Sequence, residues 1–213
     1  MDGDRDAYLD SVLIGGREPV TITVVDYDER WPQRFRDVAE RVRRVLGDDA
    51  LGVEHIGSTS VPGLAAKPIV DVLLTVHDVS KEATYVPALT SAGFLLRVRE
   101  PQHRMLRTPA RDVHLHVYEP DRPEVRDYLD LRDWLRIDAD DCELYAATKR
   151  RLAQKQWADM NDYADAKTDV IRDVLVRARA WRDGATTSPH IDLAGRGSSA
   201  GRGRPAARSR RLW

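Results

Sequence analysis

The sequence has a single cysteine and no long uncharged apolar stretch, and each of these absences excludes a class of protein. Cys142 has no second cysteine to pair with, so an internal disulfide is excluded and a reducing compartment is expected. No apolar run is long enough to span a bilayer. The first residues, Met1 to Asp4, are acidic and lead into no apolar segment, unlike a secretory signal peptide. We therefore expect a cytoplasmic protein.

An excess of charge of one sign is missing as well. The chain has 34 Lys and Arg residues against 35 Asp and Glu residues, so its formal net charge is -1 at pH 7. Such a balance gives no reason to expect the whole chain to bind nucleic acid or a membrane. Hydrophobic residues make up 42% and charged residues 32% of the 213 positions, which fits one globular core with polar extensions. There is no internal repeat.

Composition divides the chain into three parts. Residues 1–19 form a polar N-terminal lead-in with a short helical turn around Tyr8 to Leu13, and residues 20–182 carry the periodic patterns of one domain. Residues 183–213 are rich in Arg, Gly and Ser and nearly lack large apolar residues, so we expect a disordered tail. This tail is either a solvated appendage or a segment that makes weak nucleic-acid contact through its arginines.

Hydrophobic periodicity predicts alternating strands and helices in the central part. Strands are expected at 20–25, 53–56, 69–76, 94–98, 105–107 and 113–118. Helices are expected from Trp31 to the Gly47 stop signal and at 78–92, 123–135, 141–157 and 162–181, with Asp141 and Asp162 as N-caps. In the last strand, His114 and His116 alternate with apolar residues and share one face.

The most informative stretch is residues 54–71, EHIGSTSVPGLAAKPIVD, where a small, polar turn joins two apolar runs. Gly57 permits close approach of the backbone to a phosphate, and Ser58 and the N–H groups of the turn can donate to phosphate oxygens. Asp71 interrupts an apolar, β-branched run, where a carboxylate is costly to bury unless it is paired. The alternatives are a plain turn, a structural acid, and a His55 that makes only a hydrogen bond across the turn.

This stretch resembles the signature of the GrpB family, which is placed in the nucleotidyltransferase superfamily. Shorter pieces are similar in the same order: Tyr27, Trp31 and Phe35; His114 to Val117; Arg126 to Leu129; Tyr145 with Lys149; and Tyr163 with Lys167. The resemblance covers about residues 20–179. It implies an α/β (α+β) fold, a nucleotidyltransferase-like mixed sheet core with C-terminal helices that cover one side of a cleft.

The resemblance implies a site for a nucleoside triphosphate or another phosphate-bearing small molecule, with Mg²⁺ or Mn²⁺ as the cation. The first hypothesis is nucleotidyl transfer to an unidentified acceptor, with Asp71 and Ser58 as catalytic residues. The implied metal ligands are Asp71, His114 and His116. The implied phosphate- or substrate-binding residues are Gly57, Ser58, Thr59, Lys67, Arg126, Tyr145, Lys149, Tyr163 and Lys167. For each of them a purely structural or solvated role is the alternative.

One departure leaves open whether the protein is an enzyme. Active members of the wider superfamily usually carry a second acid two residues after the first, where this chain has Leu73. Asp71 alone would make a weak Mg²⁺ site, and imidazole suits Mn²⁺, Zn²⁺ or Ni²⁺ better than Mg²⁺. The second hypothesis is therefore a non-catalytic nucleotide- or coenzyme-binding module, since some relatives are joined to dephospho-CoA kinase. A third is a protein that docks partners through its Arg-rich tail.

Overall fold

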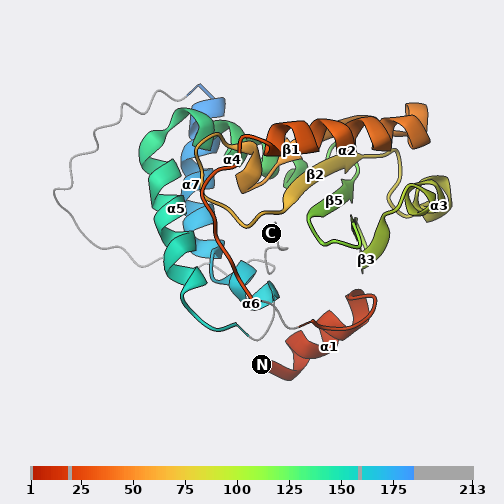
Figure 1. Cartoon of the computed structure of the whole chain (residues 1–213), viewed down its shortest axis with the longest axis horizontal. Coiled ribbons are helices and arrows are strands. Elements are labelled where there is room, and N and C mark those ends of the chain that lie inside the picture. Colours follow the sequence, from red (N-terminus) through yellow and green to blue (C-terminus); the bar gives the residue numbers. More distant parts are fainter. Residues whose placement is uncertain (1, 19–20, 158–159, 185–213) are drawn as a thin grey trace, which may run out of the picture.

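The protein is described from a computed structural model, which covers residues 2–18, 21–157 and 160–184 (Figure 1). Its centre is a five-stranded mixed sheet in the order β1-β2-β5-β4-β3. Strands β2 and β5 run parallel, and the other neighbours pair antiparallel. The strands are β1 (Gly52–Ile56), β2 (Val70–Thr75), β3 (Leu95–Glu100), β4 (His103–Arg107) and β5 (Val113–Tyr118).

Helices cover the sheet unevenly. Helix α2 (Trp31–Leu46) lies along the sheet with α3 (Val86–Ser91) near its end, while α4 (Pro123–Ile137), α5 (Ala139–Ala153) and α7 (Thr168–Arg182) form a helical half beside it (Figure 1). The remaining helices are α1 (Asp2–Val12) and the short α6 (Met160–Asp165). None of the helices within the described ranges is long and apolar enough to cross a membrane.

The main core lies between α2 and the sheet. Helix α2 presents Trp31, Val38 and Val42 on one face, at the spacing expected of an amphipathic helix, and all three are buried. The residues of β2 and β5 that alternate toward this helix are apolar and fully buried; they are Val70, Val72, Leu74, Leu115 and Val117. The period of two therefore turns the intervening residues, Asp71 and His114 among them, to the opposite face of the sheet.

The mixed α/β fold and most element positions agree with the sequence-based prediction, but the N-terminal expectations need correction. Residues 21–25 do not form a strand; they make only an isolated bridge between Val25 and Ala66, and Val20 lies outside the described residues. The lead-in holds a full helix, α1, which buries Leu9 and docks on β3 through a bridge from Leu13 to Val98. Long-range burial of Leu9 is not visible in local composition.

Three predicted helices also differ from those found. The segment 78–92 contains only a single 3₁₀ turn, Glu82–Thr84, followed by α3, because Pro87 fits only the first turn of a helix. The expected helix 162–181 is two helices, α6 and α7, with a break around Lys167. Helix α5 is capped by Asp138, whose side chain accepts from the Asp141 N–H, so Asp141 is not the cap. The predicted tail beyond residue 184 lies outside the described residues.

Candidate functional site

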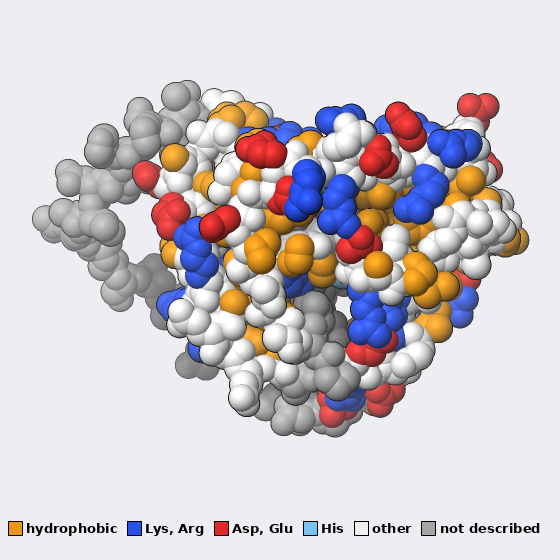
Figure 2. Space-filling model, viewed as in Figure 1, with side chains coloured by type: hydrophobic (Ala, Val, Ile, Leu, Met, Phe, Trp, Pro, Cys, Tyr) orange, Lys and Arg blue, Asp and Glu red, His pale blue; other side chains and the backbone are white. Residues whose placement is uncertain are grey.

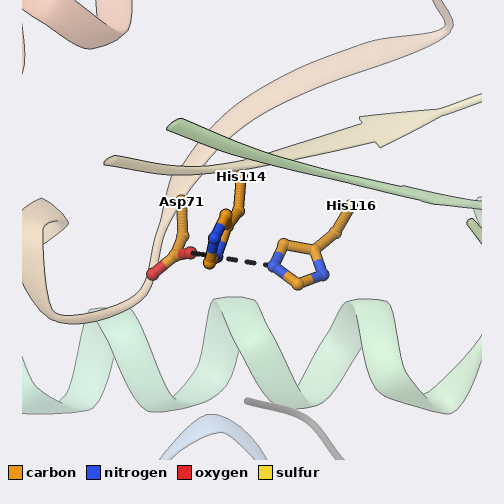
Figure 3. Close-up of side chains that lie close together, drawn as sticks. All are labelled: Asp71, His114 and His116. Carbon is orange, nitrogen blue, oxygen red and sulfur yellow. Dashed lines mark ion pairs between the residues drawn. The ribbon is translucent and has the colours of Figure 1, made fainter. Parts of the chain in front are cut away.

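Three metal-binding residue types meet on the sheet face that is turned away from α2. Asp71 of β2 is directly opposite His114 of β5 in the parallel register, and His116 follows two residues later on the same face. The Asp71 Oδ1 atom lies 3.4 Å from His114 Nδ1 and 3.7 Å from His116 Nε2 (Figure 3). One ligand atom from each residue lies within 4.8 Å of the others, so all three can reach one cation.

The close packing of Asp71 requires a glycine at position 57. Gly57 follows β1 with φ of 69°, a conformation that residues with a side chain rarely adopt. A Cβ atom at this position would lie only 2.5 Å from Asp71 Oδ2. The turn is closed by the Ser60 hydroxyl, which donates to the Gly57 carbonyl at 2.6 Å. Gly57 therefore lets the backbone pass beside the carboxylate, and phosphate contact remains a prediction.

The Asp71 carboxylate is ionised and reaches solvent. Burial alone would raise the pKa of Asp71, but hydrogen bonds and charge interactions with His114 and His116 outweigh it and hold the pKa below its ordinary value. Burial lowers the pKa of His114, and Asp71 partly opposes that effect. The Asp71 side chain is 29% exposed, so the acid is not sealed inside the protein.

The position of the missing second acid is part of an apolar core. Leu73 is 1% exposed and packs with Ile56, Tyr118, Val125 and Tyr128 between the sheet and α4. A carboxylate in this cluster would be surrounded by apolar groups and would be costly to ionise. Leu73 therefore fits this cluster by packing, and the cluster contains no acid.

A cavity of about 160 Å³ opens beside Asp71. Of the twelve residues predicted to bind metal, phosphate or substrate, eleven line it: Gly57, Ser58, Thr59, Lys67, Asp71, His114, His116, Tyr145, Lys149, Tyr163 and Lys167. The turn and the strands form one wall, and residues from α5, α6 and the segment before α7 form another. Tertiary structure thus brings together residues that are up to 110 positions apart in the chain, from Gly57 to Lys167.

Three lysines line this cavity. Lys149 and Lys167 are buried, at 2% and 6% exposure, and Lys67 lies close to the Tyr163 ring, as Lys167 does. Burial lowers the pKa of Lys67, lowers that of Lys149 strongly, and lowers that of Lys167 to about 7. Among the described residues that line the cavity, the carboxylates are those of Asp71 and Glu100. An anion bound in the cavity would favour the charged form of these lysines.

Tyrosines and the turn hold the lysines and serines in place. The Lys149 ammonium donates to the Ala65 carbonyl at 2.5 Å and lies 4.5 Å from the centre of the Tyr145 ring. Burial raises the pKa of Tyr145, whose hydroxyl is hydrogen-bonded to the Ser58 side chain. Burial also raises the pKa of Tyr163 to about 12, and its buried hydroxyl has no hydrogen-bond partner among the described residues. Both tyrosines therefore remain protonated near pH 7.

Arg126 does not join the other predicted residues. Its neighbours on α4, Val125 and Tyr128, are buried against the sheet, and the helical rotation of about 100° per residue turns Arg126 to the exposed side. Arg126 is not among the residues that line the cavity, so the expectation that it clamps a phosphate there is withdrawn.

Glu54 and His55, in the strand that leads to the glycine turn, have structural partners. Glu54 pairs with Arg132 of α4 at 2.8 Å. His55 lies on the opposite face, stacks on Phe35 and is 3.0 Å from the Thr59 hydroxyl, so the expected hydrogen bond across the turn is confirmed. Burial lowers the pKa of His55 to about 4.

Residues that the sequence analysis did not select also line the cavity, and four of them are informative. Tyr8 and Leu9 come from α1, and Glu100 and His103 come from the ends of β3 and β4. His103 shares the face of β4 that carries Met105, which pairs with His116. Alternation along residues 103–107 would have placed His103 on a common face with Met105, but the order of the strands, which brings β4 beside β5, is not readable from the sequence.

Charged side chains of both signs are mixed on one face of the molecule (Figure 2). On the face seen in Figure 2, Lys and Arg side chains lie among Asp and Glu side chains and form no large patch of one sign. The lysines of the site, Lys67, Lys149 and Lys167, line the cavity.

Comparisons with known proteins agree with this architecture. Residues 21–177 match the family described as GrpB protein. A UPF0157 protein of Streptomyces coelicolor is 54% identical over 170 residues, which cover 80% of this chain and 91% of the relative. The crystal structure of the conserved protein GrpB from Enterococcus faecalis superposes with a TM-score of 0.67 at 31% identity, covering 75% of this chain and 99% of that one. The structure of a GLD-2/RNP-8 complex matches with a TM-score of 0.53 at 10% identity, over 83% and 75%, a likeness of fold alone.

Proposed function

The chain belongs to the GrpB family, and from its site we propose that it binds a divalent cation together with a nucleoside triphosphate. The proposed reaction is transfer of a nucleotidyl group to an acceptor. The observation that carries this proposal is a single cavity that joins the Asp71, His114 and His116 donors to three lysines, two of them buried. A cation site beside an anion site is what a metal–triphosphate complex requires.

The donor set fits Mn²⁺ better than Mg²⁺. Two imidazoles and one carboxylate are softer than the all-oxygen set that Mg²⁺ prefers. The buried Leu73 offers no second carboxylate, which removes the usual way of adding a hard ligand. Of the two cations expected from the sequence, we therefore favour Mn²⁺. A bound cation would neutralise charge on the phosphates of the substrate.

The lysines and the turn are assigned to the phosphates. Lys67 and Lys167 can neutralise phosphate oxygens, and Ser58, fixed by Tyr145, can donate a hydrogen bond to one of them. An oxygen of the acceptor would attack the α-phosphorus and form a new P–O bond. The bond between the α-phosphorus and the oxygen that bridges it to the β-phosphorus would break. Pyrophosphate would leave with the electron pair of that bond.

The proposal is tested by calorimetry with Mn²⁺, followed by ATP, GTP, CTP and UTP in its presence. The wild type is expected to bind Mn²⁺ and at least one nucleotide, and Asp71→Asn is expected to weaken both. Asp48→Asn is the matched control, because Asp48 is exposed and far from the turn in the fold. Binding of no nucleotide, or nucleotide binding that Asp71→Asn leaves unchanged, would refute the proposal.

The buried Leu73 favours a second candidate, a module that binds the nucleotide without turnover. Both candidates predict that nucleotide and Mn²⁺ raise the unfolding temperature of the protein. They differ in the release of pyrophosphate on incubation with candidate acceptors. Sustained release that Asp71→Asn abolishes selects the transferase, whereas protection against heat without release selects the binding module.

A further inference from the structure

A chain of hydrogen bonds leads away from the metal-binding cluster and has no part in the proposed reaction. His103 Nε2 lies 3.2 Å from His116 Nδ1, and His103 Nδ1 lies 2.7 Å from Glu100 Oε2. The Tyr8 hydroxyl of α1 donates to the other oxygen, Glu100 Oε1. The rings of His103 and His116 are nearly parallel, at 9°, with centres 5.4 Å apart. All three links of this chain involve ring nitrogens or carboxylate oxygens with defined roles.

The order of the atoms allows one consistent set of proton positions. A carboxylate accepts hydrogen bonds, so Glu100 accepts from His103 Nδ1–H and from the Tyr8 hydroxyl. A neutral His103 then has a lone pair on Nε2 and accepts from His116 Nδ1–H. His116 Nε2 takes no part in these hydrogen bonds; it faces Asp71 Oδ1 at 3.7 Å, where a proton or a cation can lie between the two atoms. The opposite tautomer of a neutral His103, with its proton on Nε2, would place the Nδ1 lone pair against a lone pair of the Glu100 carboxylate.

We infer that Glu100 and His103 are positioning residues that fix the tautomer and the orientation of His116, so that its Nε2 is presented to a divalent cation beside Asp71. This inference rests on the metal site proposed above. Metal-binding histidines generally donate their second ring N–H to a carboxylate or another acceptor, and loss of such a partner weakens metal affinity by about 10- to 100-fold. In this protein the Glu100 carboxylate acts on His116 through the imidazole of His103.

Burial and packing make this arrangement rigid. The side chains of His103 and His116 are only 12% and 11% exposed, so water competes little for their ring nitrogens. His103 also stacks on Tyr118, with ring centres 4.5 Å apart. This series of hydrogen bonds includes Tyr8, which lies outside the matched family region of residues 21–177. Helix α1 therefore contributes to the network through Tyr8, which contacts Glu100.

The first experiment measures Mn²⁺ affinity of the full chain by calorimetry. His103→Ala is expected to lower the affinity by about 10- to 100-fold. His103→Gln is expected to retain most of it, because its carbonyl oxygen can still accept from His116 Nδ1–H. Glu100→Gln is expected to give an intermediate loss, since a neutral amide accepts a weaker hydrogen bond. His77→Ala is the matched control at an exposed histidine. Equal affinity of wild type and a folded His103→Ala would overturn the inference.

The second experiment reads the tautomer directly and needs no metal. Imidazole ¹⁵N NMR of the metal-free wild type is expected to show the His116 proton on Nδ1, with a mixed or reversed population in His103→Ala. A His116 ring that carries no proton on Nδ1 in the wild type would overturn the inference even if metal binds. If the wild type binds no Mn²⁺, the metal proposal fails by itself. The NMR result then decides separately whether the hydrogen-bonded chain orients His116.

Discussion

Lys167→Met is expected to stabilise the protein while impairing its proposed function. Lys167 is 6% exposed and its pKa is lowered to about 7 from its ordinary value of 10.5, chiefly because burial penalises the charged form. At about 1.4 kcal/mol for each pH unit, keeping this ammonium charged below pH 7 costs the folded state up to about 5 kcal/mol. Loss of the contact with the Tyr163 ring, worth about 0.5–2 kcal/mol, reduces the gain from the substitution.

The pH dependence has a defined sign. Above pH 7 the folded protein releases the Lys167 proton, while the unfolded chain keeps it until about pH 10. The unfolded state therefore binds more protons in this window, and the stability of the wild type rises with pH because of this group. The stability difference between Lys167→Met and wild type is expected to be largest near pH 6 and to shrink toward pH 9.

Urea unfolding at both pH values measures this difference, with Lys155→Met as the control because Lys155 is exposed. Sulfate binding provides the functional readout, since sulfate does not itself titrate in this range. If the charged lysine is required, the wild type loses sulfate affinity by about tenfold between pH 6 and pH 8, and Lys167→Met lacks that slope. A substitution that destabilises equally at both pH values, or leaves the sulfate slope intact, would refute the reasoning.

Three further substitutions test other parts of the site. Gly57→Ala is expected to displace the Asp71 carboxylate, because the new Cβ would lie 2.5 Å from Oδ2, and to weaken Mn²⁺ binding in calorimetry; unchanged affinity would contradict the role of the glycine. Leu73→Asp is expected to lower the free energy of unfolding by at least about 3 kcal/mol in urea titrations, rather than to add a ligand, because it places a charge in an apolar cluster. Arg126→Ala is expected to leave nucleotide affinity unchanged within error, since Arg126 is exposed and outside the cavity; a tenfold loss would return it to the site.

Local patterns were sufficient where local physics decides the structure. The apolar spacing of Trp31, Val38 and Val42 predicted α2, and the alternation around His114 and His116 predicted β5 at its observed bounds. Local patterns failed where distant packing or an interruption of a helix decides the structure. The β-branched residues from Val20 onward favour a strand, but residues 21–25 find only the single bridge to Ala66. The pattern of residues 162–181 predicts one helix, yet the helix is interrupted near Lys167. This interruption lets Lys167 reach the cavity.

The sequence by itself determined the chemistry that is available: a glycine turn, one acid in an apolar run, two histidines on one strand face, and two tyrosine–lysine pairs at helical spacing. Periodicity fixes which side chains share a face, and eleven of the twelve selected residues line one cavity in the folded protein. Only the tertiary structure decided which faces meet. The strand order placed β4 beside β5 and so brought His103 and Glu100 to His116, and the docking of α1 added Tyr8. These contacts depend on long-range packing, which no local spacing encodes.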